Sequence, residues 1–268
     1  MFVLTIDQRG STGGPDLVPS FLAELARLDP PLTGHPVFER SVGDEVQGIV
    51  RDPSTVVEIA LHALRSGRWY VGIGVGTAWV PPGASPREGT GTAFVAARKA
   101  VELAKAAGTQ VPVSVVPGIM AVEGGGDPAG EGVQACANAE AVLRLLGRIV
   151  QDRSEAQWRV ADALRRLDPG GQGPGRHGSQ KQVARELGIS EQSVSRTVLR
   201  SGWQEEWAAR PAAAMLLGLA DSHLGGDTDD PRRRDTAAAT GGHATSDNRA
   251  AGHVRSPQEP DYRNEGDA

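Results

Sequence analysis

The sequence has almost no cysteine, few aromatic residues and no long run of uncharged apolar residues. Cys136 is the single cysteine, so no disulfide can form within the chain, and this usage fits a reducing compartment. No stretch approaches the roughly 18 apolar residues of a membrane-spanning helix. The N-terminal segment also lacks the basic and apolar regions of a secretory signal. We therefore expect a cytoplasmic protein that has no membrane partner.

Clustered histidines and a strong excess of one charge are also missing. The six histidines are scattered, at no spacing that matches a zinc site. The formal net charge is −5, so the chain as a whole has no basic footprint for nucleic acid. Contact with DNA would require a local basic patch.

The pattern along the chain divides it into four zones. Residues 1–117 alternate strand-like and helix-like segments, 118–132 form a glycine-rich linker, and 133–224 are helical. Residues 225–268 are polar and lack periodicity. We expect this tail to be disordered, because it cannot bury enough apolar surface to offset the entropy of ordering.

The first zone predicts an α+β domain. Its order is strand, helix, hairpin, helix, strand, helix, which differs from a simple parallel βαβ series. The expected elements are a strand at 1–6, a helix at 16–28, two strands flanking residues 43–45, a helix at 53–64, a strand at 69–80 and a helix at 92–108.

The segment GIGVGT, residues 72–77, contains three alternating glycines. A dinucleotide-binding fingerprint would need a glycine-rich turn that opens directly onto a helix. Here the glycines lie inside a predicted strand, and the loop VPPGASPREG follows. We interpret Gly72, Gly74 and Gly76 as one strand face that another backbone or a ligand approaches closely.

Two acids come at the ends of predicted strands. Asp7 follows the first strand, and Asp44 sits on the hairpin turn. If these strands are neighbours, the two carboxylates converge into an oxygen-rich site suited to Mg²⁺ or Mn²⁺. The alternative is a strand-end acid and a turn acid without a ligand, and we interpret Glu45 as a solvated turn residue.

The loop after the first strand predicts phosphate contacts. Its backbone N–H groups lead toward the first helix and would face phosphate oxygens. The residues concerned are Gln8, Arg9, Gly10 and Ser11.

These motifs together resemble a known superfamily. An Asp after the first strand, a Gly-Asp hairpin, a glycine-rich strand and GTAFVAAR are similar to class III nucleotidyl cyclases and GGDEF proteins. VGDEVQG and GIGVGT resemble the bacterial SatD-like proteins, which pair such a domain with a C-terminal helical segment. The resemblance covers residues 1–108 and the helix-turn-helix described below. It implies a ferredoxin-like, cyclase-like domain in which Asp7 and Asp44 bind metal and Arg98 meets phosphate.

The same resemblance bears on catalysis. Cyclases place an Asn on the late helix to stabilise developing charge, and the matching position here falls within the apolar AFVAA. Val42 and Val46 replace a Gly and the Phe of the GGDEF turn. We therefore predict nucleotide or metal binding without turnover, with a cyclase-like or transferase-like enzyme as the alternative.

The segment 179–203, SQKQVARELGISEQSVSRTVLRSGW, predicts a helix-turn-helix. Ser179 would cap the first helix, and Gly188 would end it in the left-handed conformation. Ser190 would cap the second helix, and Ile189 would anchor the turn between them. The alternative is a generic helical hairpin.

The second helix of this segment would present a polar face, as readout of the major groove requires. Residues 176–200 contain five basic and two acidic residues, a local charge of about +3 that meets the need for a basic patch. The predicted DNA contacts are Ser179, Gln180, Lys181, Ser190, Gln192, Ser193, Ser195, Arg196 and Arg200.

The helix-turn-helix resembles those of MarR-like and sigma-factor-like regulators. Trp203 and Trp207 begin a further helix, where we expect them in a core. Helices at 133–150 and 215–224 would pair two chains into a homodimer that reaches two DNA half-sites. The favoured hypothesis is a DNA-binding transcriptional regulator with a nucleotide-binding or metal-binding domain. The alternatives are a metal-dependent nucleotidyl enzyme tethered by its helix-turn-helix, and a protein-interaction module.

Overall fold

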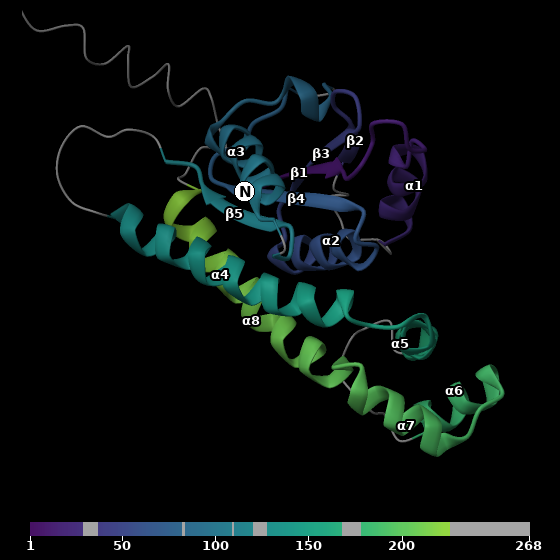
Figure 1. The fold of residues 1–268 in the computed structure, drawn as a ribbon. Coiled ribbons are helices and arrows are strands. Elements are labelled where there is room, and N and C mark those ends of the chain that lie inside the picture. Colours follow the sequence, from purple (N-terminus) through teal and green to yellow (C-terminus); the bar gives the residue numbers. More distant parts are fainter. Residues whose placement is uncertain (29–36, 82–83, 109, 120–127, 168–177, 226–268) are drawn as a thin grey trace, which may run out of the picture. The chain divides into compact units, whose positions relative to one another are not determined.

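The computed structural model describes residues 1–28, 37–81, 84–108, 110–119, 128–167 and 178–225 (Figure 1). The predicted tail after Gly225, residues 120–127 of the predicted linker and Arg176 lie outside these residues. The end of the predicted linker is helical, because α4 begins at Pro128. The described part is α+β, as the sequence predicts. Its strands are β1 (Phe2–Gln8), β2 (Val37–Arg40), β3 (Glu45–Val50), β4 (Trp69–Val75) and β5 (Val113–Pro117). Its helices are α1 (Val18–Leu28), α2 (Pro53–Arg65), the 3₁₀ helix η1 (Pro86–Glu88), α3 (Thr92–Ala106), α4 (Pro128–Gln151), α5 (Glu155–Leu167), α6 (Ser179–Leu187), α7 (Glu191–Arg200) and α8 (Trp203–Leu224).

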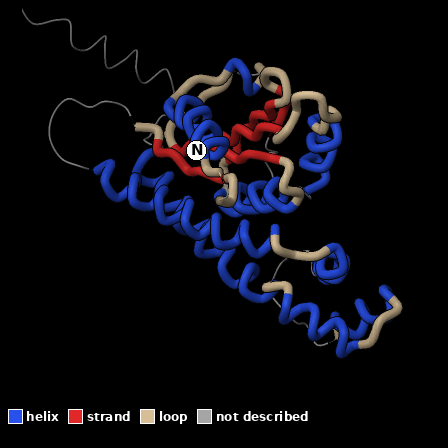
Figure 2. Tube along the Cα trace, in the orientation of Figure 1, coloured by secondary structure: helices blue, strands red, loops and turns tan. Residues whose placement is uncertain are grey.

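The five strands form one mixed sheet in the order β2-β3-β1-β4-β5 (Figure 2). β1 lies in the centre and runs antiparallel to both β3 and β4, while β4 and β5 are parallel. In the β1–β3 register Ile6 faces Val46 and Asp7 faces Glu45. The carboxyl end of β1 therefore meets the start of β3, next to the turn that carries Asp44.

The glycines of β4 allow α3 to approach the sheet at backbone distance. A Cβ atom added at Gly74 would lie 2.1 Å from the carbonyl oxygen of Ala93, and one at Gly72 would lie 2.3 Å from the backbone nitrogen of Val101. Real Cβ atoms do not come so close. The interpretation of alternating glycines as a face approached by another backbone is confirmed, and the backbone is that of α3.

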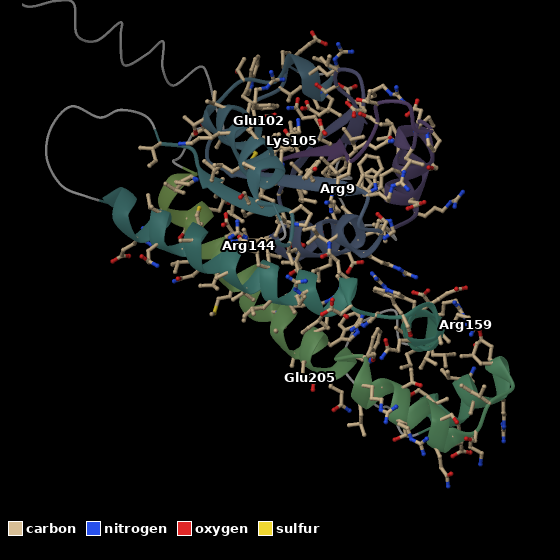
Figure 3. The ribbon with its side chains drawn as sticks, viewed as in Figure 1. Arg9, Glu102, Lys105, Arg144, Arg159 and Glu205 are labelled. Atoms are coloured by element: carbon tan, nitrogen blue, oxygen red, sulfur yellow. The ribbon has the colours of Figure 1, made fainter. Side chains whose placement is uncertain are left out.

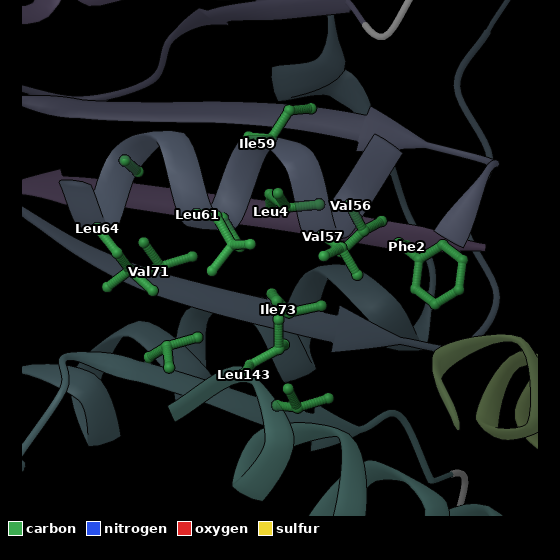
Figure 4. Close-up of a cluster of buried hydrophobic side chains, with 14 of the residues drawn as sticks. Phe2, Leu4, Val56, Val57, Ile59, Leu61, Leu64, Val71, Ile73 and Leu143 are labelled. Atoms are coloured by element: carbon green, nitrogen blue, oxygen red, sulfur yellow. The ribbon is translucent and has the colours of Figure 1, made fainter. Parts of the chain in front are cut away.

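The main apolar core joins the sheet to four helices, α1, α2, α4 and α8 (Figure 4). Phe2, Leu4 and Ile73 come from the strands, Leu143 comes from α4 and Leu217 from α8, and all five side chains are fully buried. Helix α2 contributes further residues to the same cluster. As a result, α4 and α8 belong to the packing of the sheet, and all the described residues fall in one compact unit.

A second apolar cluster holds α5, α6 and α7 together with the start of α8. Trp203 is buried there, and Trp207 packs against the cluster with the two ring centroids 5.2 Å apart. The expectation that these tryptophans are core residues is confirmed. The other buried members are Val160, Ala161, Ala163, Leu164, Val183, Ala184, Val194 and Val198.

The α6–α7 region confirms two features of the predicted helix-turn-helix and contradicts two others. Gly188 has the left-handed φ of 66°, and the Ser190 side chain accepts a hydrogen bond from the backbone N–H of Ser193. Ile189, however, is 39 % exposed, so it does not anchor the turn. Ser179 does not cap α6, because the helix begins at Ser179 itself and Gly178 is the residue before it.

The helices expected to pair two chains also pack together within the chain, and pairing between chains stays a prediction. α4 and α8 pack against each other and against α2. Among the described residues, no helix combines the length and the apolar character that crossing a membrane requires.

Candidate functional site: an acidic sheet edge and a basic helix

Four acids and two bases gather where β1, the β2–β3 turn and α3 meet. The Lys105 Nζ lies 3.0 Å from the Asp7 carboxylate and 3.0 Å from that of Glu102. Figure 3 labels Lys105 and Glu102, neighbours on α3. The Arg98 guanidinium lies 4.0 Å from Glu45. We name this cluster the acid edge, with members Asp7, Asp44, Glu45, Arg98, Glu102 and Lys105.

The structure corrects the interpretation of Glu45 as a solvated turn residue. Its side chain is only 12 % exposed. One of its carboxylate oxygens is buried and accepts no hydrogen bond from the described residues. The cause is the β1–β3 register, which places Glu45 opposite Asp7 inside the ladder and not on the tip of the turn.

Burial dominates the protonation of the two paired acids. It raises the pKa of Asp7, and the nearby charges of Asp44 and Glu102 raise it further, while Lys105 only partly opposes the change. Burial likewise raises the pKa of Glu45, against a hydrogen bond from Ser41 and the charge of Arg98. Both carboxylates are thus short of positive charge, and an added cation would stabilise their ionised forms.

The prediction that the backbone amides of Gln8 and Arg9 bind phosphate is wrong. The Gln8 N–H donates to the Asp44 carbonyl at 3.3 Å, and the Arg9 N–H donates to the Arg68 carbonyl at 2.7 Å. Because β1 runs as far as Gln8, these donors complete the sheet and are not free for phosphate. Gly10 and Ser11 follow in the turn, where Gly10 has a φ of 68°.

The Gln8 side chain closes the loop that follows β1. Its Nε2 donates to the Pro15 carbonyl at 2.8 Å, and its Oε1 accepts from the Leu17 N–H at 2.8 Å. The side chain of Arg9 donates to the Gly67 carbonyl and lies 5.0 Å above the Tyr70 ring. Both residues therefore have structural contacts.

A divalent cation could bind the acid edge only by competing with Lys105 for the Asp7 carboxylate. Across the described ranges, no group of three or more His, Cys, Asp or Glu side chains has the arrangement of a metal site. Lys105 already lies against Asp7, and Arg98 faces Glu45. Asp7 and Asp44 do reach the same end of the β1–β3 pair, so an incoming cation would have to displace Lys105 from Asp7.

Sequence reasoning missed Glu102 and Lys105, although the sequence contains a signal for them. Arg98, Glu102 and Lys105 follow the spacing i, i+4, i+7 on α3, which places them on one helix face. That face adjoins the buried stripe of Ala97 and Val101. A charged stripe beside a buried one, on a helix that packs against the sheet, brings charges to the rim of that sheet.

The second candidate surface is the outward side of α7. Gln192, Arg196 and Arg200 are exposed there, while Val194 and Val198 are buried on the opposite side. Of the other predicted DNA contacts, Lys181, Ser190 and Ser193 are exposed, and Ser179, Gln180 and Ser195 are half-buried. Sequence reasoning missed Leu199, which is 68 % exposed beside these polar residues.

A second charged cluster links α2, α5 and α8, and sequence reasoning missed it entirely. Arg153 and Glu206 are both 1 % exposed and approach to 2.6 Å. Arg210 bonds both Glu206 and Glu58, and Glu58 also pairs with Arg165. We name this cluster the joint, with members Glu58, Arg65, Arg153, Asp162, Arg165, Glu206 and Arg210.

The joint fixes α5 against α2 with well-formed contacts. Arg65 of α2 makes two hydrogen bonds of 2.7 Å to the Asp162 carboxylate of α5. Its guanidinium lies 3.7 Å above the Trp158 ring. Burial raises the pKa of Glu58, but Arg210 and Arg165 outweigh it, so its pKa lies below the ordinary value.

No family model, curated protein or solved structure matches this chain. The functional argument therefore depends on the geometry of the acid edge and of α6 and α7.

Proposed function

We propose that this protein is a DNA-binding transcriptional regulator in which α6 and α7 form a helix-turn-helix and α7 enters the major groove. The observation that carries the proposal is the two-sided character of α7. Val194 and Val198 pack inward, while Gln192, Arg196 and Arg200 project from the exposed side. Amide and guanidinium groups are the side chains that read base edges.

The turn geometry and the local charge support the same proposal. Gly188 and Ser190 hold α6 and α7 at a short, capped turn. Lys181 and Arg185 are exposed on α6 and add positive charge beside α7. Such a patch would contact phosphates and make binding salt-dependent.

We propose further that residues 1–117 are a ferredoxin-like, cyclase-like domain that binds a nucleotide without turnover. The order β2-β3-β1-β4, with α1 and α2 as connections, supports this topology. Arg98 and Lys105 would meet the phosphates, and Mg²⁺ or Mn²⁺ would share the Asp7 and Asp44 carboxylates. The cation would relieve the charge shortage of the acid edge.

The DNA proposal is tested with the full chain and with DNA from its own locus. Arg196→Ala and Gln192→Ala should each weaken binding, Gln192→Ala with a change of sequence preference, because a bidentate base contact contributes about 1–3 kcal/mol. Arg148→Ala, an exposed arginine on α4, is the control and should bind normally. The absence of any salt-sensitive shift would remove the DNA proposal and favour the protein-interaction alternative.

The nucleotide proposal is tested by calorimetry with purine triphosphates and Mg²⁺ or Mn²⁺. Asp7→Asn and Asp44→Asn should reduce the heat, and the double variant serves as the baseline. Heat equal to that baseline in the unsubstituted chain would remove the site. Pyrophosphate release that disappears in both single variants would instead establish the enzyme alternative.

A further inference from the structure

The outward side of α7 carries one apolar residue among its polar ones. Leu199 is 68 % exposed and lies outside the apolar cluster that holds α5, α6 and α7 together. It follows Gln192 by seven residues and Arg196 by three, so at about 3.6 residues per turn the three side chains lie on one face of the helix. Val194 and Val198 are buried on the other side. A leucine thus lies within the face that we propose for DNA.

The neighbours of Leu199 matter more than its exposure, because single exposed leucines are common on protein surfaces. Arg196 lies one turn before it on the same face, Gln192 lies two turns before it, and Arg200 follows it in the sequence. Within the described part of the chain, the side chains of these three polar residues make no hydrogen bond or ion pair. They and Leu199 are therefore available to one common ligand.

The charge around this face favours DNA as that ligand. Glu186 on α6 already pairs with Arg166 of α5. The unpaired charged residues of α6 and α7 are then four bases and one acid, namely Lys181, Arg185, Arg196, Arg200 and Glu191. Such surroundings attract the phosphates that line both sides of a DNA groove.

We propose that Leu199 reads the methyl group of a thymine in the major groove. Thymine is the base that presents an apolar group there, its C5-methyl, whereas the other bases present hydrogen-bond donors and acceptors. Gln192 and Leu199 are seven residues apart, which corresponds to about 10 Å along the helix and about three base-pair steps. A recognition helix in the major groove can make base contacts at this spacing. The inference rests on the proposed DNA-binding function and adds a base preference to it.

The contact is tested by removing the methyl group from the DNA. A fragment of the protein's own locus is prepared once with thymine and once with deoxyuracil, which pairs in the same way but lacks the methyl group. The full chain should bind the thymine fragment roughly four-fold more tightly, because burying one such carbon contributes about 0.8 kcal/mol and about 1.4 kcal/mol is ten-fold. Leu199→Ser should bind the two fragments alike. Equal binding of both fragments by the unsubstituted chain would overturn the proposal.

Two control variants separate the methyl contact from other changes. Leu145→Ser replaces a leucine of α4 that is 69 % exposed, close to the 68 % of Leu199, and should keep the four-fold difference. Lys181→Ala should weaken both fragments by the same factor, because a phosphate contact carries no sequence information. A Leu199→Ser variant that still prefers thymine would assign the methyl contact to another side chain and overturn the proposal.

Single replacements of thymine by deoxyuracil then locate the contact. The sensitive methyl group should lie about three base pairs from the base whose preference changes in Gln192→Ala. A sensitive methyl group a full turn of DNA away from that base would contradict the placement of Leu199 and Gln192 in one groove.

The same titrations distinguish this inference from the proposed function. Salt-sensitive binding with no difference between the two fragments keeps the regulator and overturns the Leu199 contact. Failure to bind either fragment, even at low salt, overturns both and leaves a protein partner as the occupant of the exposed leucine.

Discussion

The acid edge and the joint both place carboxylates beside basic side chains in partly buried surroundings. The pKa values of these carboxylates nevertheless shift in opposite directions. At the acid edge, burial prevails and raises the pKa of Asp7 and of Glu45. At the joint, Arg210 and Arg165 prevail over burial and lower the pKa of Glu58. The positive charge around Glu58 thus outweighs burial, although burial lowers the pKa of Arg153 in the same cluster. At Asp7 and Glu45 the charges of Lys105 and Arg98 do not outweigh burial.

This difference in pKa shift is the reason for proposing a ligand at the acid edge and not at the joint. A buried carboxylate that has two guanidinium partners gains nothing from a further cation. A carboxylate whose pKa is raised is stabilised when a cation arrives, which is the electrostatic pattern of functional sites. We therefore place the proposed ligand at the acid edge, while the ion pairs of the joint hold α5 and α8 against α2.

The largest expected effect comes from breaking the joint at its most buried pair. Glu206→Gln should lower the free energy of unfolding by about 3–5 kcal/mol, because Arg153 is left charged and without a carboxylate partner in the interior. Urea unfolding followed by tryptophan fluorescence measures the loss. Glu205→Gln, the exposed neighbour, is the control and should change stability by less than about 0.5 kcal/mol.

Replacing both members of the pair tests the reason for that loss. Arg153→Met combined with Glu206→Met removes the unpaired charge and should recover part of the stability. A double variant as unstable as Glu206→Gln would mean that the site needs the ion pair for its shape and not for its charge balance.

The second prediction concerns Glu58 and the pH dependence of stability. Glu58→Gln should cost about 2 kcal/mol at neutral pH, because two arginines lose a charged acceptor. The folded pKa of Glu58 lies below its ordinary 4.5, so its contribution is present above pH 4.5 and is lost as pH falls through the folded pKa. The difference between parent and variant should therefore shrink on acidification. A constant difference would contradict the lowered pKa.

The third prediction is that the stability contribution of Asp7 at the acid edge depends on pH in the opposite sense to that of Glu58. The folded pKa of Asp7 lies above its ordinary 3.8, so its favourable contribution is present below pH 3.8 and is lost as pH rises through the folded pKa. Asp7→Asn should thus be neutral or stabilising by up to about 1 kcal/mol at neutral pH, where the ionised carboxylate costs stability. Thermal unfolding of Asp7→Asn and Glu58→Gln between pH 3 and pH 7 would show opposite slopes relative to the parent. Parallel slopes would remove the distinction between the two clusters.

The two clusters also differ in how far the sequence predicts them. The convergence of Asp7 with the Asp44 turn follows from adjacent strands, since a hairpin beside the first strand is a local pattern. The burial of Glu45 could not be predicted in this way, because a shift of one residue in register moves a side chain to the other face of the sheet. The β4 glycines indicated a close backbone approach, but not that α3 was the partner.

The joint lies beyond sequence reasoning for a different reason. Glu206 and Arg210 are visible as an i, i+4 pair on one helix, but Glu58 is about 150 residues away in the chain. The contact depends on α4 and α8 packing against α2, which the apolar pattern of each helix permits without specifying the partner. The turn at Gly188 and Ser190 was predictable, because its determinants lie within a few neighbouring residues.

The smallest effect is the most direct test of the charge shortage at the acid edge. Lys105→Met removes the cation that lies 3.0 Å from Asp7, so the pKa of Asp7 should rise further and a divalent cation should find less competition. In the parent, Mn²⁺ must displace Lys105 from Asp7, and two unit charges about 4 Å apart in water attract each other by about 1 kcal/mol. Without this cost, Mn²⁺ should bind Lys105→Met roughly five times more tightly. Mn²⁺ titration followed by electron paramagnetic resonance measures this affinity. Lys99→Met removes an exposed lysine from the same helix and should leave it unchanged. Equal Mn²⁺ affinity in the parent and in Lys105→Met would mean that Lys105 does not occupy the cation position, and the acid edge would then have no advantage over the joint as a binding site.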